Sequence, residues 1–124
     1  MDKKRFSTVF LLLLFFQVGY SQADVFDYNT IAIKPQFPGG ISEFMKFVIT
    51  NYQIPEEDDV VTGVLEVAII IDSKGKVTKT TIIQDVGNAG NEVKRILSNC
   101  PKWIPGKQDG IDVATRYTFP VTIK

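Results

Sequence analysis

Residues 62–86 restrict the fold of this chain most strongly, because their pattern is typical of two β-strands joined by a tight turn. Their sequence is TGVLEVAIIIDSKGKVTKTTIIQDV. Apolar residues alternate in the first half, which places the odd-numbered residues from Leu65 to Ile71 on one face of a strand. We predict a short hairpin loop at Asp72 to Gly75, in which Gly75 can adopt the left-handed backbone conformation. Residues 77–84 are rich in β-branched side chains, so we predict that they return antiparallel.

A first helix is predicted from residue 41, where apolar side chains begin to recur at helical spacing. They are Ile41, Phe44, Phe47 and Val48. The turn-forming sequence Pro38–Gly40 precedes them, and Glu43 lies in the first turn, where a carboxylate favours the positive end of the helix dipole. We expect the helix to end near Asn51, because Pro55 cannot continue it.

A second helix is predicted in the segment DVGNAGNEVKRILSNCPKW, where the apolar spacing returns to 3.6 residues. Its apolar stripe consists of Val93, Ile96, Leu97 and Cys100. Pro101 ends this helix, and Trp103 is interpreted as a core anchor rather than a platform for a ligand. Pro105–Gly106 fits the centre of a turn, and Asp109–Gly110 predicts a second reversal.

The last predicted strand runs from Val113 to the C-terminus with alternating apolar residues. Pro120 has no backbone N–H to donate, so this strand is expected at a sheet edge. The order of elements is helix, strand, strand, helix, strand. It predicts an α+β fold of two layers, in which the two helices cover one face of an antiparallel sheet.

The N-terminus has the pattern of an export signal. Lys3, Lys4 and Arg5 precede an apolar run over residues 9–16, and Gly19 and Ser21 have the small-residue spacing of a cleavage site. We therefore expect residues 1–21 to be a cleaved signal peptide and residues 22–33 to be a short tail. The alternative is an inner-membrane anchor over residues 6–20, although this run is shorter than the roughly 20 apolar residues of a spanning helix.

The sequence argues against an enzyme. It contains no histidine, which is the commonest general base and metal ligand, and it has no G-x-S-x-G, C-x-x-C, P-loop or dinucleotide motif. The acidic run at residues 56–59 lacks the spacing of a calcium loop and is interpreted as a solvated turn. Without the signal region the chain is about neutral to slightly acidic and has no basic patch for nucleic acid. We therefore predict no catalytic residue, no metal and no cofactor.

Cys100 is the single cysteine of the chain, so no disulfide can form within one molecule. Its predicted place at a helix C-terminus disfavours the reactive thiolate, because the helix dipole is negative there. We interpret Cys100 as a packed, unreactive side chain; a bridge between two chains is the alternative.

Three sequence motifs, taken in order, resemble the C-terminal domain of the TonB family. They are PQFPGG at residues 35–40, the strand GVLEVAIIID with its SKGKV hairpin, and a helix that runs into CPKWIPGK. The resemblance covers about residues 34–124. The positions that we interpret as structural are Gly63, Gly75, Cys100, Pro101, Trp103, Pro105 and Gly106.

The resemblance implies a periplasmic, non-enzymatic protein-binding domain with two helices on a three-stranded antiparallel sheet. In that family the last strand adds a short peptide, the TonB box of an outer-membrane transporter, to its free edge, which links the domain to energy-coupled transport. Transferred by position, the binding edge consists of Val113, Ala114, Thr115, Arg116, Tyr117, Thr118 and Phe119. Arg116 and Tyr117 are the expected side-chain contributors, and the usable edge should stop near Pro120.

Full transducers of the family resemble a membrane anchor joined to this domain by a long proline-rich spacer. Here about 13 residues separate Ser21 from Lys34, which span roughly 45 Å when fully extended. We therefore expect a binding domain exported alone. The alternative function is a structural or assembly protein that forms a homodimer through its edge strand.

Overall fold

The computed structural model describes residues 24–54 and 62–124. The predicted signal peptide at residues 1–21, Pro55 and the acidic run at residues 56–59 lie outside these ranges. Within them, no helix is long and apolar enough to cross a membrane.

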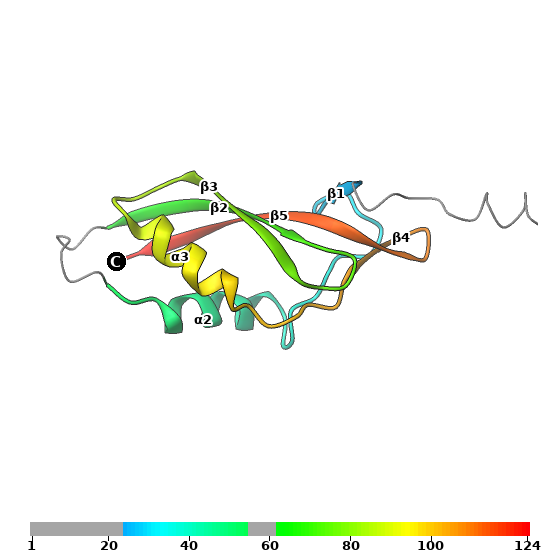
Figure 1. Ribbon diagram of the computed structural model, residues 1–124, viewed down its shortest axis with the longest axis horizontal. Helices are drawn as coiled ribbons and strands as arrows, with labels where there is room; N and C mark the ends of the chain where they lie inside the picture. The colour runs from blue at the N-terminus through cyan, green and yellow to red at the C-terminus, as the bar shows by residue number, and fades with distance from the viewer. Residues whose placement is uncertain (1–23, 55–61) are drawn as a thin grey trace, which may run out of the picture.

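The fold has two layers, a sheet and a pair of helices on one of its faces (Figure 1). The helices are α2 (Ile41–Asn51) and α3 (Ala89–Ser98). The strands are β1 (Val25–Asp27), β2 (Gly63–Ile71), β3 (Val77–Gln84), β4 (Gly106–Gln108) and β5 (Ile111–Ile123). The predicted α+β class is confirmed, and so is the end of the first helix at Asn51.

The sheet is larger than the three strands expected, because five strands take part in the order β1-β5-β2-β3, with β4 also paired to β5. The central pairs β2–β3 and β2–β5 are antiparallel, as predicted, whereas β1 runs parallel to β5. Both unpredicted strands, β1 and β4, are three residues long. Such segments are too short to display a period of two, so the sequence pattern could not reveal them.

The predicted hairpin is confirmed, and its loop is held by local hydrogen bonds. Oδ1 of Asp72 accepts the N–H groups of Lys74 and Lys76, both at 2.9 Å. Gly75 adopts a φ of 86°, in the left-handed region that glycine favours. The Gly75 carbonyl accepts the N–H of Trp103 at 2.8 Å, so this turn is fastened to the segment that follows α3.

The core lies between the sheet and the helices. The odd-numbered residues of β2 from Leu65 to Ile71 are fully buried against Phe44 and Val48 of α2 and against α3. Trp103 is buried, as predicted, and its ring lies 4.8 Å from that of Phe44, centroid to centroid, in an edge-on arrangement. The alternating and helical patterns therefore identified the core faces of β2, α2 and α3.

Two local predictions are wrong, and a third is confirmed. Helix α3 ends at Ser98, because the N–H of Cys100 bonds to the Leu97 carbonyl in a tighter final turn, so Cys100 follows the helix instead of completing it. Gly106 is in β4, not in a turn with Pro105; a Cβ there would lie 2.6 Å from Oγ1 of Thr115, so the packing requires glycine. The reversal at Asp109–Gly110 is confirmed as the turn between β4 and β5.

The described part of the segment predicted as a tail, residues 24–33, belongs to the fold. Its residues 25–27 form β1 on the sheet, Ile31 is buried, and Ile33 makes an isolated bridge with Lys107. The polar residues in the turn after β1 interrupt any apolar pattern, so the sequence does not indicate that this segment joins the sheet.

Candidate functional site

The edge of β5 is divided into a covered part and an open part. Ala114–Arg116 pair with β1 on the edge away from β2, and Val113 pairs with β4. Residues 117–123 pair with β2, and no other described strand pairs with them. The predicted free edge over residues 113–119 is therefore wrong for its first four residues, because the short strands β1 and β4 occupy them.

The open part presents an identifiable set of backbone groups. The carbonyl of Arg116 accepts the N–H of Tyr28 at 2.9 Å, so the backbone of Arg116 points away from β2. Backbone groups alternate along a strand, and the pairing of β5 with β2 has no register shift, so Thr118, Pro120 and Thr122 point the same way. Pro120, which lacks an N–H, thus occupies a position where β2 needs no donor. The open edge offers two N–H groups and three carbonyls.

The side chains of the predicted edge divide between core and surface. Val113, Ala114, Thr115 and Phe119 are buried, Tyr117 is half-buried, and Arg116 and Thr118 are exposed. The Tyr117 ring lies 4.4 Å from that of Tyr28 and 5.2 Å from that of Phe119. Burial raises the pKa of the Tyr117 hydroxyl, and Tyr28 adds to the rise. Tyr117 is therefore a packing residue, whereas Arg116 and Thr118 are accessible.

A hollow of about 370 Å³ lies beside the open edge. Val64, Glu66, Thr118 and Pro120 of its lining alternate with core residues and therefore face away from the helices, whereas Leu65 and Phe119 belong to the core. Its lining comes from three strands: Val64, Leu65, Glu66, Gln84, Thr118, Phe119 and Pro120. The hollow was not predicted from the sequence. Its one indication there was that Val64 and Glu66 alternate with the core residues of β2 and must therefore lie on the other face of the sheet.

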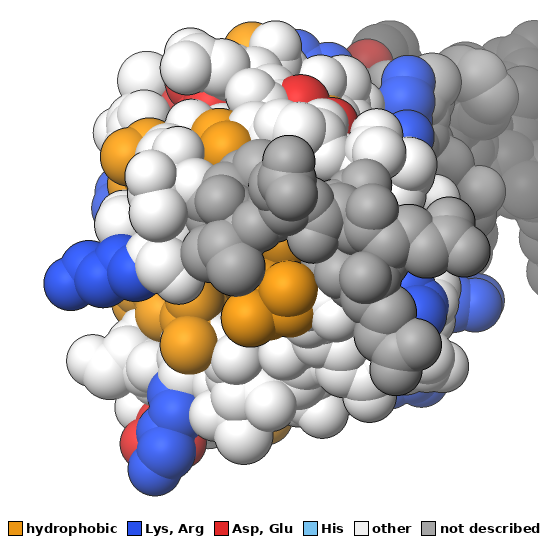
Figure 2. Space-filling view, turned by 90° about the vertical axis from the view of Figure 1, so that its left-hand side faces the viewer, with side chains coloured by type: hydrophobic (Ala, Val, Ile, Leu, Met, Phe, Trp, Pro, Cys, Tyr) orange, Lys and Arg blue, Asp and Glu red, His pale blue; other side chains and the backbone are white. Residues whose placement is uncertain are grey.

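Apolar side chains are also exposed near the end of the sheet where β5 terminates. Val64 is 47% exposed and Ile83 is 54% exposed. Figure 2 faces this end of the molecule and shows hydrophobic atoms at the surface among polar ones. Apolar surface beside unpaired backbone is a combination suited to binding protein.

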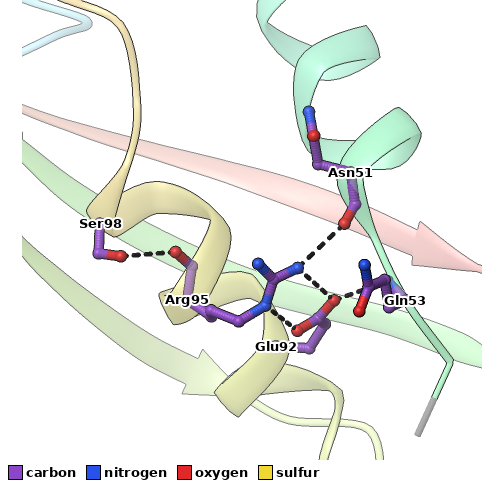
Figure 3. A network of polar contacts seen from close by, with 5 residues as sticks. All are labelled: Asn51, Gln53, Glu92, Arg95 and Ser98. Carbon is purple, nitrogen blue, oxygen red and sulfur yellow. Dashed lines mark hydrogen bonds and ion pairs between the residues drawn. The ribbon is translucent and has the colours of Figure 1, made fainter.

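A separate polar network joins the two helices (Figure 3). The guanidinium of Arg95 donates to both carboxylate oxygens of Glu92, at 2.6 and 2.9 Å, and to the carbonyl of Asn51 at 3.2 Å. Glu92 also accepts the backbone N–H of Gln53 at 2.6 Å. These contacts fasten the end of α2 to α3 and lie within the helix layer, so we assign them a structural role.

Cys100 is half-buried and packs against the core. Burial raises the pKa of its thiol, and the neighbouring Trp103 side chain opposes the rise only in part. A raised pKa lowers the thiolate fraction at neutral pH, which agrees with an unreactive cysteine.

The described residues include no group of three or more side chains of the types His, Cys, Asp or Glu that could hold a metal ion. The accessible features of the described surface are thus a backbone edge, a hollow and apolar side chains.

Comparison with known proteins gives one match. The model of the family described as "Gram-negative bacterial TonB protein C-terminal" matches residues 58–123, more than half of the chain. The match includes β2, β3, α3, β4 and β5, and so contains the whole open edge and the hollow. No curated protein and no solved structure matches the chain.

Proposed function

The chain belongs to the family of Gram-negative bacterial TonB C-terminal domains, and on this basis we propose that it binds an extended segment of a partner protein along the open edge of β5. TonB-like domains are periplasmic protein-interaction modules. The partner in this proposal is the TonB box of an outer-membrane transporter, which adds a strand to the sheet. Export of the domain after cleavage of residues 1–21 is part of the same proposal.

The observation that carries the proposal is the row of backbone groups at Thr118, Pro120 and Thr122, which point away from β2 and meet no described strand. An added strand satisfies such groups with main-chain hydrogen bonds, which bind any extended sequence. Flanking side chains then supply selectivity. The site shifts from the predicted residues 113–119 towards the C-terminus, to residues 117–123, because β1 already occupies Ala114–Arg116.

Thr118→Pro tests the proposal directly. It removes the outward N–H of residue 118, just as proline already removes that of residue 120. Both groups point away from β2, so the pairing of β5 with β2 keeps its donors. A partner carbonyl left without a donor costs about 1–3 kcal/mol, so we expect peptide affinity to fall about fivefold or more. The measurement is calorimetry with synthetic peptides that carry TonB-box segments of outer-membrane transporters.

Thr118→Val is the matched control, because it changes the same side chain and keeps the N–H. We expect it to bind these peptides about as well as the unchanged protein, with circular dichroism showing that both variants are folded. Equal affinity of a folded Thr118→Pro variant would contradict the proposal.

A further inference from the structure

The hollow beside β5 is aligned with a row of cross-strand neighbours. Glu66 of β2 pairs with Gln84 of β3 on one side and with Pro120 of β5 on the other. All three residues line the hollow, and they share one face of the sheet because directly opposed residues project to the same side. The row runs across three strands and ends at the open edge.

A strand added to this edge would extend the row by one residue. Directly opposed residues of neighbouring strands project to the same face, so the residue of the added strand that faces Pro120 points towards the hollow. Neighbouring strands lie about 4.8 Å apart, so this residue is two strand spacings, or about 10 Å, from Glu66. Only a long side chain, reaching over Pro120, can meet the Glu66 carboxylate.

The lining favours a particular side-chain chemistry. Val64 and Pro120 are apolar, Thr118 and Gln84 are neutral, and Glu66 is the single carboxylate among the described residues that line the hollow. The basic residues Arg116 and Lys79 belong to the row of Ile70, which is four residues or about 13 Å along β2 from Glu66. A lysine or arginine combines an apolar stem with a cationic tip and therefore matches this lining.

We propose that the hollow is a selectivity pocket for a lysine or arginine of the bound segment, at the position that faces Pro120, with Glu66 as its ionic partner. This inference rests on the proposed strand addition and specifies the chemistry of the segment that is captured.

The experiment is a selection of random ten-residue peptides displayed on phage against four purified proteins: the unchanged protein, Glu66→Gln, Glu43→Gln and Thr118→Pro. Glu43 lies in the first turn of α2, in the helix layer, so Glu43→Gln matches the loss of charge away from the hollow. We expect the unchanged protein and Glu43→Gln to select peptides enriched in lysine or arginine at one position. Glu66→Gln should select peptides without this enrichment, and Thr118→Pro should capture few.

Binding measurements with one selected peptide then give the contribution of the ion pair to affinity. Replacing its basic residue by alanine should weaken binding to the unchanged protein about twofold to fivefold, the range of a partly exposed ion pair, and should not affect binding to Glu66→Gln. The difference should shrink at high salt, because exposed charges are screened. Glu66→Lys should shift the preference at the same position towards aspartate or glutamate.

The outcomes separate the two proposals. Peptides that depend on the Thr118 N–H but show no basic preference, or the same preference with Glu66→Gln, would overturn the pocket and leave strand addition standing. Unchanged selection by Thr118→Pro, or no selection by any of the proteins, would overturn both.

Discussion

At the scale of single residues, the contact between Gly75 and Trp103 joins two parts of the fold that are far apart in sequence. A Cβ at Gly75 would lie 1.8 Å from the carbonyl oxygen of Trp103, and the Gly75 carbonyl accepts the Trp103 N–H. The sequence indicated glycine here for a turn. The close approach of a second backbone is an additional requirement that only the folded chain reveals.

Gly75→Ala should therefore destabilise the protein more than a positive φ alone would. Gly110→Ala is the matched control, since Gly110 has a φ of 76° but no neighbouring atom within 4 Å of an added Cβ. The left-handed conformation costs an ordinary residue about 1–2 kcal/mol, which is the loss expected for Gly110→Ala. Gly75→Ala also separates the backbones and loses a hydrogen bond, so we expect about 3 kcal/mol or more. Urea unfolding measures both, and equal losses would contradict this account.

At the scale of elements, the ion pair of Glu92 and Arg95 within α3 also bonds to the backbone at the end of α2 (Figure 3). The hydrogen bond from Arg95 lowers the pKa of Glu92, and the N–H of Gln53 also contributes. A carboxyl whose pKa is lower in the folded state stabilises the protein above its unfolded pKa. That contribution disappears as the pH falls through the lowered folded value.

Glu92→Gln should reduce stability near pH 7 and have a progressively smaller effect as the pH falls below the ordinary carboxyl range. The midpoint of urea unfolding, measured for both proteins between neutral and acidic pH, tests this expectation. A difference between the two proteins that is independent of pH would mean that the carboxylate charge contributes nothing to stability. Arg95→Met should reproduce the larger share of the pH-dependent part, because it removes the partner that lowers the pKa of Glu92 most and leaves the Gln53 N–H in place.

At the scale of the whole molecule, both helices cover one face of the sheet, and the face with the hollow carries no described helix (Figure 1). The open edge could in principle pair with a second copy of the chain. In a two-fold pairing centred on Pro120, however, the two prolines face each other, and both central hydrogen bonds are missing. This geometry favours a different strand as the partner.

A disulfide-linked dimer through Cys100 is not expected, because the thiol is half-buried and its pKa is raised. The mass in solution, measured by light scattering on a sizing column, should be the same with and without reductant. A dimer that dissociates on reduction would contradict this expectation and support a Cys100 disulfide between two chains. Cys100→Ser should have the same mass and bind the same peptides as the unchanged protein.

The long elements could be predicted because their side chains repeat with a period. Leu65 to Ile71, Val93 and Leu97 were identified in this way, and the hairpin at Gly75 was identified from its turn residues. The family resemblance supplied their arrangement. The end of α3 was misplaced by two residues, because Cys100 continues the apolar stripe although its N–H bonds to Leu97 in a tighter turn. The free edge was misplaced because three-residue strands leave no periodic trace.

Local pattern in the sequence determined which residues of each long element face the core, since burial repeats every second residue in a strand and about every 3.6 in a helix. The tertiary structure determined what each edge and face of the sheet meets. Pairing between β1 and β5 joins residues about ninety positions apart, and no local rule records it. Pro120 connects the two levels: its missing N–H indicated a free edge, and the fold placed that edge at residues 117–123, beside the hollow that Glu66 lines.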